Sequence, residues 1–277
     1  MLPAEPWRMV HRSDVKRARK VRTLFLSDIH LGFKRARVRE LSEFLLGIDA
    51  ERIVLVGDIV DALSLSARFF WSADHTQVVR TLLARRRAGA RIIYIPGNHD
   101  ASLALLAEML QGQFEVHREW VHRTARGRRL LVMHGDQFDG LVPCPGWLGR
   151  LGDALYEGTV MLNNGLNDVR RLFRRPYWSL AERIKLNIGA SLRYITRFEE
   201  IAAGHARMQG YDGVVCGHIH RPNLRRIGGT LYCNTGDWVE SCSAVVEQMS
   251  GELQLLRWPH GSHAAQVDET SLLADAA

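Results

Sequence analysis

The chain has 277 residues, of which 46% are hydrophobic and 24% are charged. This composition is that of a globular protein with one large core, so it excludes wholesale disorder, and no apolar run approaches the roughly 20 residues of a membrane-spanning helix. The formal net charge of +7 comes almost entirely from arginine, which fits a phosphorylated substrate, anionic lipid or nucleic acid without choosing among them.

Both ends of the chain are expected to lie outside the folded domain. Residues 1–20 are mixed and basic and lack the apolar stretch of a secretory signal, so they predict a flexible basic leader in a cytoplasmic protein. Residues 259–277 predict a loose tail, which leaves 21–258 as the domain. The cysteines form no C-x-x-C pair and predict buried free thiols in a reducing cytosol.

The first half of the domain alternates apolar strands with helical patterns. Strands are predicted at 21–27, 53–56 and 91–95, and helices at 38–46, 71–87 and 102–110. This βαβαβα order predicts an α/β layered sheet.

The second half of the domain has a different pattern. Its predicted strands are 114–121, 129–133, 213–216, 230–234 and 243–247. Between them, residues 141–209 show no strand pattern and mix arginine with aromatic residues at helical spacing. We expect a helical insertion that serves either as a lid over the substrate or as a structural or dimer surface.

Side chains that bind metals follow five of the predicted strands. They are Asp28 and His30, Asp58, Asn98, His134, and His218 with His220. Each has an ordinary explanation when taken alone, as a turn or a cap. Because ligand sites lie at the carboxyl ends of strands in parallel sheets, the joint pattern predicts one shared metal site.

The chemistry of this ligand set favours a two-metal hydrolase. Carboxylate, imidazole and amide groups suit divalent Mn, Fe, Zn or Co, and the lack of thiolates argues against a structural zinc site. The two oxygens of Asp58 can bridge a pair of ions. Two ions about 3.5–4 Å apart clamp the attacking and leaving oxygens at phosphorus and generate hydroxide near neutral pH.

The blocks Asp28-x-His30, Gly57-Asp58-x-x-Asp61, Gly97-Asn98-His99-Asp100, His134-Gly135-Asp136 and Gly217-His218-x-His220 together resemble the calcineurin-like metallophosphoesterase superfamily. The resemblance implies a four-layer αββα sandwich with mixed sheets. It also implies two divalent ions, one held by Asp28, His30, Asp58 and His220, the other by Asp58, Asn98, His134 and His218. It further implies that His99 donates a proton or stabilises the transition state and that Asp100 orients it. For Asp61, Asp100 and Asp136, a turn or an outer-shell role stays open.

Two further segments, 27–32 and 234–241, are similar to the bacterial UDP-2,3-diacylglucosamine diphosphatase branch. This similarity implies a Mn²⁺ enzyme of lipid A biosynthesis that cleaves a nucleotide-linked lipid diphosphate to a lipid 1-phosphate and UMP. Such an enzyme would contact the cytosolic face of the inner membrane peripherally. The chain departs from that branch at His99, where members often carry arginine, and in the loop 137–140.

Two alternatives remain beside this interpretation. The first is a phosphodiesterase or nuclease of the same superfamily, although no helix-turn-helix or aromatic RNA-binding motif is present, so nucleic acid is not an expected partner. The second is a catalytically silent metal-binding scaffold, which the complete ligand set and the His99-Asp100 pair disfavour.

Overall fold

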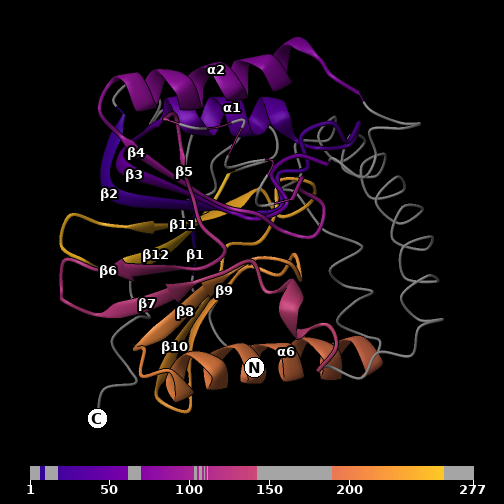
Figure 1. Cartoon of the computed structure of the whole chain (residues 1–277), viewed down its shortest axis with the longest axis vertical. Helices are drawn as coiled ribbons and strands as arrows, with labels where there is room; N and C mark the ends of the chain where they lie inside the picture. Colours follow the sequence, from indigo (N-terminus) through magenta and orange to yellow (C-terminus); the bar gives the residue numbers. More distant parts are fainter. Residues whose placement is uncertain are drawn as a thin grey trace.

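The computed structural model describes residues 7–9, 18–61, 70–102, 105, 108, 110, 112–141 and 189–258. These residues form four layers: helices α1 and α2, a seven-stranded sheet, a five-stranded sheet, and helix α6 (Figure 1). The predicted αββα sandwich is therefore confirmed.

The seven-stranded sheet has the order β1-β12-β11-β2-β3-β4-β5. Its strands are β1 (Trp7–Met9), β2 (Arg19–Leu26), β3 (Ile48–Val56), β4 (Arg91–Ile95), β5 (Glu115–Val116), β11 (Ser243–Glu247) and β12 (Leu253–Arg257). Strands β2, β3, β4 and β5 are parallel, whereas β11 runs antiparallel to both β2 and β12. The sheet is thus mixed, as predicted.

The five-stranded sheet has the order β6-β7-β8-β10-β9. Its strands are β6 (Trp120–Arg123), β7 (Arg129–Val132), β8 (Gly213–Cys216), β9 (Asn223–Ile227) and β10 (Thr230–Asn234). The three central strands are parallel, and the edge strands β6 and β9 are antiparallel to their neighbours.

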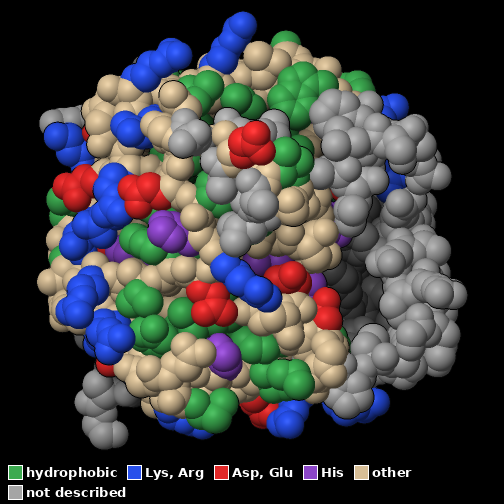
Figure 2. Space-filling view, in the orientation of Figure 1, with side chains coloured by type: hydrophobic (Ala, Val, Ile, Leu, Met, Phe, Trp, Pro, Cys, Tyr) green, Lys and Arg blue, Asp and Glu red, His purple; other side chains and the backbone are tan. Residues whose placement is uncertain are grey.

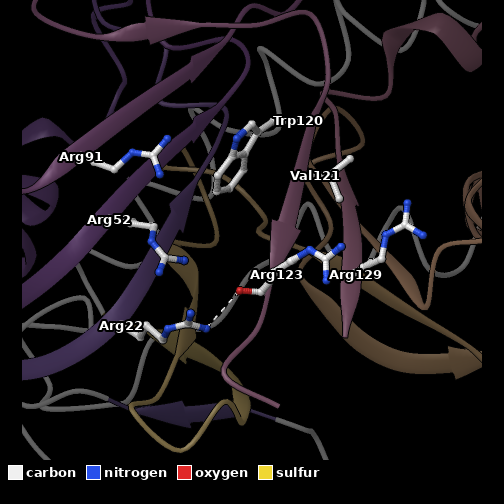
Figure 3. Close-up of a pocket in the computed structure, with 7 residues that line it drawn as sticks. All are labelled: Arg22, Arg52, Arg91, Trp120, Val121, Arg123 and Arg129. Atoms are coloured by element: carbon white, nitrogen blue, oxygen red, sulfur yellow. Dashed lines mark hydrogen bonds between the residues drawn. The ribbon is translucent and has the colours of Figure 1, made fainter. Parts of the chain in front are cut away.

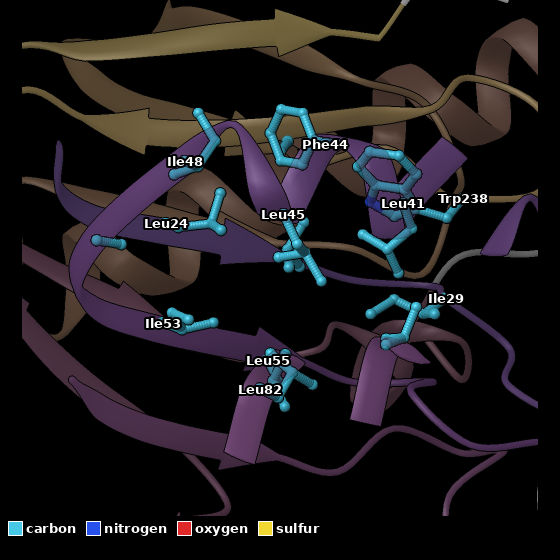
Figure 4. Packing of buried hydrophobic residues seen from close by; sticks show 14 of the residues in the cluster. Leu24, Ile29, Leu41, Phe44, Leu45, Ile48, Ile53, Leu55, Leu82 and Trp238 are labelled. Atoms are coloured by element: carbon cyan, nitrogen blue, oxygen red, sulfur yellow. The ribbon is translucent and has the colours of Figure 1, made fainter. Parts of the chain in front are cut away.

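Three apolar clusters separate the four layers. Helices α1 (Val38–Leu46) and α2 (Ala73–Arg87) cover the outer face of the larger sheet, where Phe44 packs against Trp238 (Figure 4). Phe25 and Val54 belong to the cluster between the two sheets. Helix α6 (Gly189–Met208) covers the smaller sheet through Phe198 and other residues. Each such side chain contributes about 1.5–3 kcal/mol when fully buried.

Several elements differ from the sequence predictions. The predicted strand 114–121 is two strands, β5 and β6, which lie in different sheets. Strands β1, β9 and β12 were not predicted, and β1 together with the first residues of β2 belongs to the segment expected as a flexible leader. Most of the predicted 141–209 insertion, much of the 102–110 helix and the 259–277 tail lie outside the described residues.

The parallel strands of the two sheets deliver their carboxyl ends to one edge of the sandwich, on the right of Figure 1. The loops that follow β2, β3, β4, β7 and β8 carry the predicted ligands. Within the described part of the chain, no helix is long and apolar enough to span a membrane.

Candidate metal centre

Carboxylate and imidazole groups from five strand ends converge at this edge. Asp28, His30 and His220 offer ligand atoms within 4.8 Å of one another, and Asp28, Asp58 and His134 form a second such group. Asp28 is 0% exposed and Asp58 is 2% exposed. Because buried ionised carboxylates are costly unless they are paired or bind metals, these clusters require positive charge between them.

Three buried ligand atoms point into the clusters: His30 Nε2 has no hydrogen-bond partner among the described residues, and Asp28 Oδ1 and His134 Nε2 have only other candidate ligands beside them. His220 Nε2 lies 3.0 Å from Asp28 Oδ1, and Asp58 Oδ2 lies 3.4 Å from His134 Nε2 and 4.0 Å from His30 Nε2. Buried polar atoms are normally satisfied. A cation among these atoms would satisfy them, so the donor set fits divalent metals.

The buried imidazoles of His30 and His134 differ in protonation at pH 7. His134 Nδ1 lies 3.0 Å from the Val56 carbonyl oxygen, to which it donates, and this fixes Nε2 as the ligand atom. Burial, and then the charge of His220, lower the pKa of His30 to about 4, so its ring is neutral at pH 7. Burial opposes charge on His134, but the Asp58 hydrogen bond and both carboxylates raise its pKa to about 10. A metal must therefore displace a proton from His134.

The backbone at the ligand positions is unusual. Six non-glycine residues in the described chain have positive φ, and five of them are predicted ligands: Asp28, His30, Asp58, His218 and His220. Left-handed backbone is uncommon outside glycine and gathers at functional sites, where the surrounding structure compensates its cost. The same turns thus aim several side chains at one point.

Two glycines leave room for the ligands. A Cβ atom on Gly97 would collide with the Asp58 carboxylate, and a Cβ atom on Gly57, whose φ is +86°, would collide with the His134 ring. Their lack of a side chain therefore permits the close approach of the loops after β3, β4 and β7.

His99 has a different carboxylate partner from the one predicted. Its Nδ1 lies 3.2 Å from Asp61 Oδ1, and its backbone N–H donates to Asp58 Oδ1 at 2.9 Å. Asp100 instead accepts hydrogen bonds from Tyr94 and from the backbone of Ile59, Val60 and Gly97. That Asp100 orients His99 stays a prediction; in the structure the Asp100 side chain binds the loops together. Asp61 holds the orienting position.

Asn98 and His218 are the two predicted ligands outside these groups of acidic and imidazole side chains. Asn98 lies in the turn after β4 with an exposed side chain, and His218 Nε2 lies 2.6 Å from Asp139 Oδ1. If His218 binds a metal, Nδ1 is the nitrogen left for it. Both residues stay predicted ligands. Asp139 also accepts a hydrogen bond from Tyr194 of α6, a role that sequence reasoning missed because the partners are distant in sequence.

The segment after β10 supports the ligand loops from behind. Ser27 Oγ donates to the Asp28 carboxylate and contacts Thr235. The backbone N–H of Trp238 donates to the Asp28 carbonyl at 3.0 Å, and Asn234 Nδ2 donates to the Gly217 carbonyl at 2.7 Å. The sequence motif 234–241 is therefore part of the framework of the centre. The sequence signal for this supporting role is the group of polar residues that directly follows a buried strand.

The αββα sandwich thus gathers buried carboxylates and imidazoles at its strand ends, an arrangement that defines an α/β protein with a candidate metal centre. The model of the calcineurin-like phosphoesterase superfamily domain matches residues 21–249. The chain belongs to this superfamily, so it is a member of a family of metal-dependent hydrolases. No curated protein matches the sequence at a significant level.

Solved structures resemble the chain only distantly. A novel archaeal phosphodiesterase has 12% identity and a TM-score of 0.43, over 85% of this chain and 98% of that one. Yfce, a phosphoesterase from E. coli, has 16% identity and a TM-score of 0.42, over 82% and 88%. Vps29 from Entamoeba histolytica, solved with zinc, has 14% identity and a TM-score of 0.39, over 86% and 98%.

Proposed function

We propose that this protein is a dinuclear metal phosphohydrolase that cleaves the diphosphate of a nucleotide-linked lipid, with UDP-2,3-diacylglucosamine as the substrate and a lipid 1-phosphate and UMP as products. One observation carries the dinuclear proposal: Asp58 Oδ2 lies 4.0 Å from His30 Nε2 and 3.4 Å from His134 Nε2, so this carboxylate stands near imidazoles assigned to different ions. A carboxylate between two sets of imidazoles suits a pair of ions.

The ligands are divided between two ions in this proposal. Asp28, His30, Asp58 and His220 would hold one, and Asp58, Asn98, His134 and His218 would hold the other. When bound, such ions polarise phosphoryl oxygens and lower the pKa of a water to near 7. We propose Mn²⁺, while Fe, Zn and Co suit the same donors.

His99 supplies the proton for the departing oxygen. Its side chain is 37% exposed, so a substrate can reach the ring, and it stands edge-on to the His30 ring with centroids 4.9 Å apart. Asp61 accepts from Nδ1 and leaves Nε2 to face the substrate. The bond from the His99 backbone to Asp58 keeps this group next to the ligands.

The choice of a lipid substrate is supported by the similarity of segments 27–32 and 234–241 to the diphosphatase branch. The arginine-rich insertion 141–209 would cover acyl chains and meet phosphates. We propose that the enzyme takes its substrate at the cytosolic face of the inner membrane through peripheral contact.

The test compares turnover of UDP-2,3-diacylglucosamine with that of bis-p-nitrophenyl phosphate and free nucleotides in Mn²⁺. We expect the lipid to exceed the simple diester in kcat/KM by about two orders of magnitude or more, because remote binding contacts promote the reaction. Turnover of the diester alone would overturn the lipid substrate and leave a phosphodiesterase. No turnover with Mn, Fe, Zn or Co, while metal still binds, would favour a silent scaffold.

A further inference from the structure

We infer that the protein has a second anion site, an arginine-lined cavity at the end of the sandwich opposite the metal centre, which binds an oligophosphate chain. This inference is independent of the proposed catalytic function. The cavity has a volume of about 500 Å³ and is lined by Arg22, Arg52, Arg91, Trp120, Val121, Arg123 and Arg129 (Figure 3). Its size lies within the range of small-molecule sites, about 300–1,000 Å³.

One wall of the cavity is a row of guanidinium groups. Arg22, Arg52 and Arg91 come from the adjacent parallel strands β2, β3 and β4, and Arg52 is the register partner of Arg91. In Figure 3 the three side chains extend from these strands toward the β6 side of the cavity. Neighbouring strands lie about 4.8 Å apart, so successive guanidinium groups can contact successive phosphoryl groups of one extended ligand.

The smaller sheet provides the other wall. Trp120 of β6 gives this wall an apolar surface, whereas the side chains of Val121, Arg123 and Arg129 extend to the far side of β6 in Figure 3. The Trp120 indole stands between the two walls in Figure 3. Figure 2 shows Lys and Arg side chains gathered on the left of that face, where this hairpin lies in Figure 1.

Carboxylates pair with two of the five arginines that line the cavity. Arg91 is paired with Glu115 through two bonds of 2.9 and 2.7 Å, and Arg22 binds Glu247 at 2.8 Å. Arg52 and Arg123 have no ion pair with the residues that the structure describes, which leave out 1–6, 10–17, 62–69, 142–188, 259–277 and several residues between 103 and 111. A cavity that gathers more guanidinium groups than carboxylates attracts anions.

Arg22 is held in place by a buried network. Glu247 is 0% exposed, and it also accepts hydrogen bonds from Thr23 and from the Ala125 N–H and contacts His122 Nε2 at 2.8 Å. Arg22 further donates to the Arg123 carbonyl at 3.0 Å, which ties β2 to the β6–β7 hairpin. At least one arginine of the wall is thus preorganised, which lowers the entropic cost of binding.

The arrangement places the Arg52 guanidinium near two other positive charges, those of Arg22 and Arg91. Burial, and then the charge of Arg22, lower the pKa of Arg52; Glu247 and Glu51 oppose this shift, and Arg91 adds to it. Like charges placed side by side disfavour the charged form. A bound oligophosphate would relieve that repulsion, since Arg pairs with phosphate in fork geometry.

The cavity is separate from the metal centre. Arg22 lies in β2 and Asp28 just beyond its carboxyl end, which puts roughly 20 Å between them at about 3.3 Å per residue. The arginine row and Asp28 therefore lie at opposite ends of β2, while Trp120 pairs with Val132, two residues before His134.

The test is calorimetric titration of the full chain with inorganic triphosphate and with ATP, in EDTA so that the metal centre does not bind phosphate. We expect binding by the wild type and at least about tenfold weaker binding by Arg52→Gln, since a charge-assisted bond is worth about 1.5–3 kcal/mol. Tighter binding of ATP than of triphosphate would indicate that the Trp120 surface contacts the adenine base.

Arg80→Gln is the matched control, because Arg80 is exposed on α2, away from the cavity, and its loss changes the net charge equally. We expect Arg80→Gln to bind as the wild type does, and Arg52→Gln to unfold at the same or a higher temperature. No binding of either probe by the wild type would overturn the inference, as would equal losses in the two variants. Binding of anionic phospholipid vesicles but of neither free probe would overturn it too, in favour of a membrane contact.

Discussion

At the scale of single residues, the contact between His99 Nδ1 and Asp61 Oδ1 is the feature of the centre that bears on proton donation. We expect His99→Ala to retain its metals and to lose about 10²–10⁴ in kcat, the usual contribution of a general acid. Asp61→Asn should lose part of the same factor, because the amide no longer fixes the imidazole. Steady-state kinetics with metal analysis of each variant tests this. Metal loss in His99→Ala would show that the ring is a ligand instead.

Asp100 provides the contrast at the same scale. Its carboxylate joins the β4 turn to the loop after β3 through four hydrogen bonds. Asp100→Asn should therefore lower the melting temperature, whereas Asp61→Asn should leave it nearly unchanged. The sequence places Asp100 beside His99 in the chain, whereas the structure brings Asp61 to the His99 ring. Asp61 is distant from His99 in sequence, so only the fold could reveal the contact.

Asp139 is expected to position His218. Asp139→Ala should weaken metal binding by about 10–100-fold, the usual effect of losing the outer partner of a ligand histidine. Asp139→Glu should recover part of the affinity, and Glu200→Ala on the exposed face of α6 serves as the control. Metal titration against a competing chelator measures the change. Equal affinity in Asp139→Ala and the wild type would show that His218 does not bind the metal.

At the scale of elements, Glu247 links β11 to β2 and the β6–β7 hairpin. The hydrogen bonds to Glu247 outweigh its burial and lower its pKa to about 2 from 4.5. Because the folded-state pKa is depressed, this stabilisation is present above about pH 4.5 and is lost as the pH falls toward 2. The shift corresponds to about 3 kcal/mol of unfolding free energy.

Glu247→Gln should therefore lower the unfolding free energy at pH 7 by about 3 kcal/mol or more, since the Arg22 guanidinium loses its carboxylate partner. The deficit relative to the wild type should shrink toward pH 2. Urea denaturation in EDTA at several pH values measures it, with the exposed Glu252→Gln as control. A deficit that does not change between pH 7 and pH 2 would contradict the role given to the carboxylate.

The sequence predicted elements well where one periodicity dominated. Helix α1 has the bounds 38–46 that its apolar spacing predicts. The segment 114–121 failed because its apolar residues satisfy the pattern of one strand, while the chain crosses from one sheet to the other between β5 and β6. Strand β9 was missed because its residues are only partly buried and rich in arginine, so its strand partner β10 decides its conformation.

For the whole molecule, we expect metal binding to stabilise the fold. Ions that bind only the folded state at about 100 times their Kd add about 2.7 kcal/mol, which for a domain of this size is roughly 5–10 °C in melting temperature. Addition of Mn²⁺ to chelator-treated protein should show this shift, and Asp58→Ala should show much less of it. An equal shift in the exposed control Asp74→Ala is expected, whereas an equal shift in Asp58→Ala would contradict the role of Asp58 as a shared ligand.

The global arrangement was predictable because the metal ligands follow strands whose direction fixes where they meet. The arginine cavity was not, since Arg22, Arg52 and Arg91 lie in three different strands and share no sequence motif. Only the parallel register of β2, β3 and β4 and the approach of β6 bring them together. Pattern reasoning detects groups that follow a motif and cannot detect groups that only the packing assembles.

The left-handed turns at the metal centre restrict how such a site can evolve. Asn, Asp and His are the non-glycine residues most often found in that conformation, and they are also metal ligands. A glutamate at position 28 or 58 would keep a carboxylate but would bear a backbone cost of about 1–2 kcal/mol. A residue at each of these positions must therefore meet two requirements: its side chain must bind the ion, and its backbone must adopt a positive φ. We expect the centre to drift among these three residue types and to resist replacement by other ligands.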